Sequence, residues 1–266
     1  MPAADQRTPG LDELVGRLDA LIALPHVAEE YIRFRVDLLK AQWAVRQALA
    51  ATPLSGPAPE PARAATRSQA GPTKPVLGPS TVPFDPGLLR GLFAALHKAA
   101  IEHGRQTEDM QRLAAAVEED PALLQELACR AAFGPEMEAL EGLARNLRVL
   151  VDVLLFIGRA LASPFVVEAA RRLAIQSGGS VPAQAGGRCR MCGSLPSFAR
   201  LRRKDGRRIL HCGLCGRNWE FTRLACPCCG SADRDALNLL RLSEGDPRWI
   251  ETVSYTHLTL PTKRIV

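Results

Sequence analysis

The sequence has few aromatic residues, because Phe, Trp and Tyr together make up only 5% of its 266 positions. It also lacks an uninterrupted hydrophobic run. Arg148, Asp152 and Arg159 break the most apolar stretch, residues 147–167, whereas a membrane span needs about 20 consecutive apolar residues. The N-terminus turns polar at once and has no apolar core of the kind that a signal peptide needs. We therefore expect no membrane insertion and a soluble protein that stays where it is made, in the cytoplasm.

The sequence also lacks a recognisable catalytic constellation. Its upstream histidines are scattered and none belongs to a hydrolase or transferase motif: His26, His97, His103 and His211. His211 directly precedes a cysteine and is interpreted as an ordinary strand residue. Cys129 has apolar neighbours, which is typical of a small core residue. We expect a protein that is not an enzyme.

Ala, Leu and Arg are plentiful and favour helices. Apolar residues at three- and four-residue steps predict N-terminal helices in 1–51 and a helical domain in 87–178, with Asp85-Pro86 as the start signal. The first helix of the domain 87–178 begins at this signal. Further helices are predicted at about 107–118, 120–132, 135–161 and 164–176. Residues 52–86 hold nine of the chain's twenty prolines, so we predict a flexible linker or insert there.

After a glycine-rich hinge at 178–187 the helical period ends. Short alternating pieces, each beside a cysteine pair, predict strands at 197–201, 208–211, 218–223 and 237–242. The predicted fold class is therefore mainly α. A helical N-terminal part is followed by a small metal-stabilised zinc-ribbon β region over 186–252.

Four cysteines form two CxxC pairs separated by nineteen residues: Cys189, Cys192, Cys212 and Cys215. A glycine follows each pair, and Asp205-Gly206 marks a hairpin turn between them. Four soft ligands at this spacing suit one tetrahedral metal site. The alternative of two redox dithiols lacks the surrounding βαβ pattern. Tetrahedral sulfur coordination suits both zinc and iron, so the sequence leaves the metal open.

Cys226-Pro-Cys-Cys229 is a third pair, read as Cys226-x-x-Cys229. No fourth cysteine pair follows it, and His257 is the only other soft ligand downstream. Cys228, between the two ligands, is interpreted as an alternative ligand. A redox or sulfur-handling thiol is the competing interpretation.

Positive charge is concentrated beside the cysteines. Residues 186–230 contain ten Lys/Arg and two Asp/Glu, a net charge of +8. Part of this charge offsets the −2 of a tetrathiolate site, and an acidic partner would explain it as well. The basic residues of the predicted hairpin are Arg200, Arg202, Arg203, Lys204, Arg207 and Arg208. This patch supports an alternative function, a basic zinc-ribbon nucleic-acid-binding protein, although few exposed aromatics are available to stack on bases.

The motifs Cys-Arg-Met-Cys-Gly-Ser-Leu-Pro from Cys189, Leu-His-Cys-Gly-Leu-Cys-Gly-Arg-Asn-Trp from Leu210 and Cys-Pro-Cys-Cys-Gly from Cys226 resemble the formate dehydrogenase accessory protein family, FdhE. The match is strongest over about 186–242. It implies a cytoplasmic maturation factor with two rubredoxin-like modules, associated with iron. Such a factor binds the catalytic subunit of a respiratory formate dehydrogenase and is needed for its activity. The resemblance also argues against nucleic acid as a partner. By the resemblance, Cys189, Cys192, Cys212 and Cys215 ligate the first metal, and Cys226 and Cys229 are half of a second site.

The chain departs from the family's pattern in three places. Arg190 stands where the family often has Pro, and the segment 52–86 is unusually long. The family's fourth pair is expected near residue 253, but residues 253–266 break the preceding pattern. We interpret 253–266 as a non-native tail and the second module as truncated. The particular client enzyme, its binding surface and the oligomeric state are not predicted.

Overall fold

The computed structural model describes residues 9–24, 27–52, 75–134, 138–176, 186–202, 204–233, 235, 237–241, 248–253 and 258–264. The chain divides into two compact units. The helical unit comprises residues 1–54 and 84–165, and the cysteine unit comprises residues 55–83 and 166–266. The chain therefore passes between the units three times, because residues 55–83 group with the cysteine-rich part.

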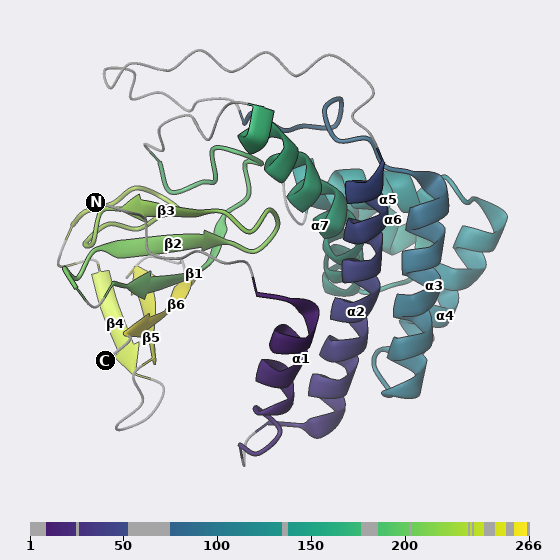
Figure 1. Ribbon diagram of the computed structural model, residues 1–266, viewed down its shortest axis with the longest axis horizontal. Coiled ribbons are helices and arrows are strands. Elements are labelled where there is room, and N and C mark those ends of the chain that lie inside the picture. The colour runs from purple at the N-terminus through teal and green to yellow at the C-terminus, as the bar shows by residue number, and fades with distance from the viewer. Residues whose placement is uncertain are drawn as a thin grey trace. The chain divides into compact units, whose positions relative to one another are not determined.

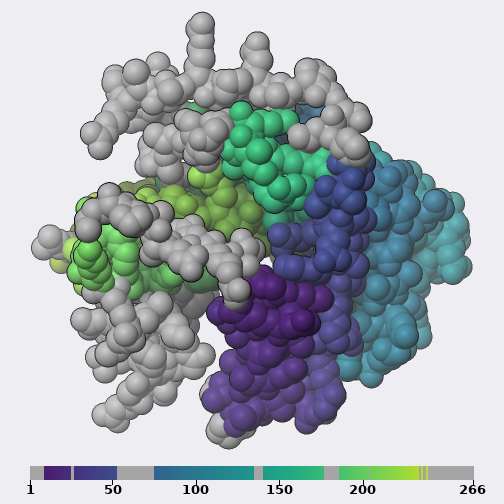
Figure 2. Space-filling model, in the orientation of Figure 1, coloured from purple at the N-terminus to yellow at the C-terminus, as the bar shows by residue number. Residues whose placement is uncertain are grey.

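The described residues contain seven helices (Figure 1): α1 (Leu11–Asp19), α2 (Glu29–Ala51), α3 (Pro86–Glu102), α4 (Thr107–Glu119), α5 (Leu123–Phe133), α6 (Glu138–Leu147) and α7 (Val151–Gln176). The predicted start signal of α3 is confirmed, because the Asp85 carboxylate accepts the Leu88 N–H at 2.8 Å. In Figure 2, α1 is the purple surface element, packed beside α2.

The boundary between the last two helices differs from the prediction. The sequence predicts helices at about 135–161 and 164–176, but α6 ends at Leu147 and α7 runs from Val151 straight through Pro164. Arg148 lies between them with a left-handed φ of 54°. A non-glycine residue in this conformation stops a helix. The prediction of one helix over about 135–161 and a separate helix from 164 is therefore wrong.

A tertiary hydrogen bond explains how α7 tolerates its proline. Proline has no N–H, so the carbonyl of Ala160, four residues before Pro164, loses its helical donor. The side-chain amide of Gln42, on α2, donates to that carbonyl at 2.7 Å. The helix continues because a residue 118 positions away along the chain supplies the missing hydrogen bond.

The core of the helical unit is almost entirely aliphatic. Its largest fully buried side chains are Leu89, Leu92, Leu96, Leu113, Leu124, Leu127, Leu140, Leu154, Ile157 and Leu161. Helices α5 and α7 approach closely at Gly158, where an added Cβ would lie 2.5 Å from the Cβ of Ala131. Helix α7 is long and apolar enough to cross a membrane by length and composition, but 67% of its most apolar window is buried inside the protein. That burial is typical of a core helix.

The strands form one sheet in the order β3-β2-β1-β6-β5-β4. They are β1 (Pro196–Leu201), β2 (Arg208–Cys212), β3 (Asn218–Phe221), β4 (Leu237–Arg241), β5 (Arg248–Val253) and β6 (Leu258–Arg264). All pairs are antiparallel except β1 with β6, which is parallel. The four predicted strands are confirmed to within two residues. Strand β6 lies within 253–266, whose interpretation as a non-native tail stays a prediction.

Candidate metal centre

Three tight turns carry the cysteine pairs, and we call them the first knuckle (Cys189–Gly193), the second knuckle (Cys212–Gly216) and the third knuckle (Cys226–Gly230). In each, the N–H of the glycine donates to the carbonyl of the first cysteine, at 2.8, 3.0 and 2.8 Å. The glycine φ values are 80°, 74° and 76°, a left-handed conformation that glycine adopts without steric cost. The N–H of each first cysteine donates to the carbonyl five residues later, at 2.9, 2.8 and 2.8 Å. The three turns therefore have the same backbone hydrogen bonds and the same glycine conformation.

The first two knuckles bring four thiols together. The Sγ atoms of Cys189, Cys192, Cys212 and Cys215 lie within 4.8 Å of one another, and all four residues are buried. The Sγ atoms of Cys189 and Cys215 are 3.5 Å apart, as are those of Cys192 and Cys212. The grouping expected from the sequence is thus the grouping that the fold produces.

This arrangement fits a tetrathiolate metal ion. Four sulfurs bound at about 2.3 Å in a tetrahedron lie about 3.8 Å apart, which is close to the separations here. The second knuckle also supplies an amide donor, because the N–H of Cys215 lies 3.5 Å from the Sγ of Cys212. Amide donors of this kind stabilise thiolate ligands. The four cysteines could therefore hold one zinc or iron ion.

Without a cation, the four thiols cannot all ionise. Hydrogen bonds from the other three side chains lower the pKa of Cys189 far below its usual value. The pKa of Cys192 is also lowered. The hydrogen bond with Cys189 raises this pKa, but the hydrogen bonds with Cys212 and Cys215 lower it further than that. Hydrogen bonding to Cys189 and then to Cys192 raises the pKa of Cys212 and of Cys215. The metal-free cluster therefore holds at least the two protons of Cys212 and Cys215, which a bound metal would displace.

We expect metal binding to this cluster to weaken steeply in acid. Displacement of about two protons implies roughly a 100-fold loss of apparent affinity for each pH unit below neutrality. We also expect about one ion per chain, because the part of the chain that the structure describes holds one clustered set of four thiols. Elemental analysis and chelator competition between pH 6 and 8 measure both quantities. A pH-independent affinity would contradict a thiol-derived site.

The third knuckle contributes no thiol to this cluster. Cys226 is buried, whereas Cys228 and Cys229 are exposed. Among the described residues, the metal-type grouping consists of the first four cysteines alone. The assignment of Cys226 and Cys229 to a second site, and of Cys228 as an alternative ligand, therefore remains a prediction, and His257 lies outside the described residues.

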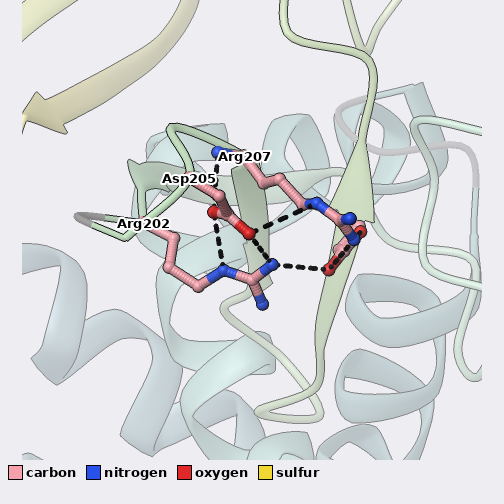
Figure 3. A network of polar contacts seen from close by, with 4 residues as sticks. Arg202, Asp205 and Arg207 are labelled. Atoms are coloured by element: carbon pink, nitrogen blue, oxygen red, sulfur yellow. Dashed lines mark hydrogen bonds and ion pairs between the residues drawn. The ribbon is translucent and has the colours of Figure 1, made fainter.

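Asp205 in the hairpin between the first two knuckles and Glu220 on β3 neutralise part of the hairpin's positive charge (Figure 3). Asp205 accepts from Arg202 Nε at 2.8 Å, and Glu220 accepts from Arg207 Nη1 at 2.9 Å. Two further ion pairs, each with an N–O distance of 3.3 Å, join Arg202 to Glu220 and Arg207 to Asp205. The hydrogen bond from Arg202, and then the one from the Arg207 backbone, lowers the pKa of Asp205 to about 2. Two of the six cations of the predicted basic patch are thus paired with carboxylates.

Arg208, counted in the same basic patch from sequence, is not a surface residue. It is 1% exposed, and its Nη1 donates to the carbonyl of Ala225 at 2.8 Å. It therefore connects β2, which carries Cys212, to the residue before the third knuckle. An added Cβ at Gly187 would lie 1.8 Å from the Pro227 carbonyl, so the third knuckle also contacts the chain just before Cys189. Sequence reasoning counted Arg208 among the basic surface residues and missed this role, since a strand arginine carries no burial signal.

His211 is a strand residue, as predicted. Its ring stacks on Phe198 with a centroid separation of 4.4 Å, and its Nδ1 lies 2.8 Å from the Asn218 side-chain oxygen. Phe198 is 42% exposed. Cys129 is half-buried on α5, and burial raises the pKa of its thiol, which fits a packing role rather than a reactive one.

Comparison with known proteins gives a match in fold. The chain is similar to a solved structure titled the crystal structure of the FdhE protein from Pseudomonas aeruginosa, with a TM-score of 0.62 and 19% sequence identity. The similarity covers 97% of this chain and 85% of that one. No protein-family model matches the chain, and no curated protein matches it in sequence. The fold implied by the sequence resemblance is therefore confirmed: a mainly helical chain with a small sheet and a cysteine cluster.

Proposed function

We propose that this chain is a formate dehydrogenase accessory protein of the FdhE family. In this proposal it binds the catalytic subunit of a respiratory formate dehydrogenase in the cytoplasm and is needed for that enzyme's activity, without turnover of its own. The observation that carries the proposal is the similarity in fold to an FdhE protein over 97% of the chain. The motif resemblance over about 186–242 supports it independently of the fold.

We assign the metal ligands of this factor to Cys189, Cys192, Cys212 and Cys215, with iron as the metal and zinc as the alternative. Their burial and mutual separations support the assignment. Cys226 and Cys229 would supply half of a second site, with Cys228 as an alternative ligand. The metal would act structurally in this proposal, holding the first and second knuckles and the hairpin between them as one rigid surface.

Co-purification tests the proposal directly. The tagged, metal-loaded chain is mixed with the catalytic subunit of a respiratory formate dehydrogenase from the same source, and retention on the affinity resin is measured. We expect a stoichiometric complex with the unsubstituted chain and with Cys129→Ser, whose cysteine lies outside the cluster. Cys212→Ser should lose the complex together with the metal. Absence of any complex with the loaded, unsubstituted chain would contradict the proposed partner.

The same preparation separates this function from the alternative, a basic zinc ribbon that binds nucleic acid. The ion pairs of Arg202 and Arg207 reduce the positive field of the hairpin, and phosphate binding depends on that field. We therefore expect no mobility shift of single- or double-stranded nucleic acid at physiological salt. A salt-dependent shift there would favour the alternative.

A further inference from the structure

A short segment far from the cysteines in sequence lies across the first knuckle. We call residues 75–83 the strap. The N–H of Val76 donates to the carbonyl of Arg190 at 3.2 Å, and the N–H of Leu77 donates to the carbonyl of Met191 at 2.7 Å. Arg190 and Met191 are the two residues between Cys189 and Cys192. The strap therefore holds the carbonyls of both residues that separate the two cysteines.

The strap is anchored by its own packing. Leu77 is 3% exposed and Val82 is 2% exposed. The Pro75 ring lies so near the turn that an added Cβ at Gly193 would approach it to 2.8 Å. Between the anchors, the Thr81 hydroxyl accepts the Gly78 N–H at 2.7 Å and closes a turn. Buried apolar side chains at both ends keep the two amide donors in place.

The hydrogen bond from Leu77 bears on the sulfur ligands because a peptide group is planar and trans. Its C=O and N–H point to opposite sides, so fixing one fixes the other. The Met191 carbonyl belongs to the same peptide group as the N–H of the ligand Cys192, so holding this carbonyl also fixes the direction of the Cys192 N–H. Leu77 therefore holds the peptide group that joins Met191 to the ligand Cys192.

We propose that the strap retains the metal at the proposed centre by holding the first knuckle in its ligating conformation. The proposal rests on the metal centre proposed above and not on the identity of the client. Strap and knuckle are more than 100 residues apart in sequence, so the cysteine spacing alone does not determine how long the metal stays bound. Because residue 84 re-enters the helical unit, the strap also joins the metal centre to the start of α3 through the chain.

The rate of metal release from the full chain tests this. The chain is loaded with Zn²⁺ and mixed with excess chromophoric chelator, and release is followed by absorbance. Leu77→Pro removes the amide donor and should release Zn²⁺ about tenfold faster, the scale expected from losing one buried hydrogen bond and its anchor. Leu77→Ala loses the buried side chain but keeps the N–H, so it should show a smaller acceleration than Leu77→Pro. Ser80→Ala, at an exposed position of the strap, should release at the unsubstituted rate.

Equal release rates for all three variants and the unsubstituted chain would overturn the proposal. If Leu77→Pro fails to fold, hydrogen exchange in the unsubstituted chain decides: the Val76 and Leu77 amides should exchange at least about tenfold more slowly with Zn²⁺ than without. Equal exchange in the two states would also overturn it. Failure of the unsubstituted chain to bind Zn²⁺ at all would instead reject the metal centre, which distinguishes the two failures.

Discussion

Replacing Cys212 with serine is expected to abolish tight metal binding and to unfold the ribbon formed by the first two knuckles and strands β1–β3. Cys212 is completely buried at the end of β2. A four-ligand structural site contributes about 10–16 kcal/mol, so loss of one thiolate should weaken the metal roughly 100- to 1000-fold. The ribbon buries few large apolar side chains, chiefly Met191, Ile209, Leu210, Leu214 and Trp219. Without the metal we expect too little burial to keep it folded.

Elemental analysis and two-dimensional NMR of the full chain check this result. The ribbon signals should collapse in Cys212→Ser, whereas the signals of the helical unit should persist, because that unit has its own aliphatic core. Cys129→Ser is the matched control and should keep about one ion per chain. A Cys212→Ser variant with full metal content and an unchanged ribbon would show that Cys212 is not a ligand.

Replacing Gln42 with methionine is expected to destabilise the helical unit by about 2 kcal/mol, because it leaves the buried carbonyl of Ala160 without a donor. Methionine has a similar length, so the change removes the hydrogen bond with little loss of packing. Pro164 is the reason that this carbonyl depends on Gln42. Chemical denaturation followed by helical circular dichroism measures the free energy of unfolding.

A double-mutant cycle provides the control. Pro164→Ala restores a backbone N–H that can donate to Ala160 within α7. In that background Gln42→Met should cost less than about 0.5 kcal/mol, so the two substitutions should couple strongly. Equal costs in both backgrounds would show that Gln42 does not compensate for the proline.

The sequence left two explanations of the positive charge beside the cysteines open: compensation of a tetrathiolate site and binding of an acidic partner. Arg202 and Arg207 face carboxylates, and Arg208 is buried on the carbonyl of Ala225. The net charge of +8 already includes the two carboxylates that pair with Arg202 and Arg207, so the burial of Arg208 is what lowers the charge that this surface presents to a partner. Part of the charge serves the fold itself, which sequence composition does not reveal.

The sequence by itself determined the features that depend on near neighbours in the chain. Cysteine pairs three residues apart, each followed by glycine, specify the knuckles, because the turn needs a left-handed residue at that position. Asp85 and Pro86 specify the start of α3 in the same local way, through a cap and a fixed φ. Alternation of apolar residues located β1 to β4 to within two residues. Each of these signals is complete within a few positions.

Only the tertiary structure decided the features that depend on distant partners. Helix α7 passes Pro164 because Gln42 supplies a donor from another helix. Arg208 can be buried because the carbonyl of Ala225 accepts its hydrogen bond. Residues 75–83, which belong to the segment predicted as a linker, hydrogen-bond to the first knuckle. In each case a backbone polar group needs one partner when it is buried. The sequence shows which groups need a partner, and the folded chain alone brings the partner to them.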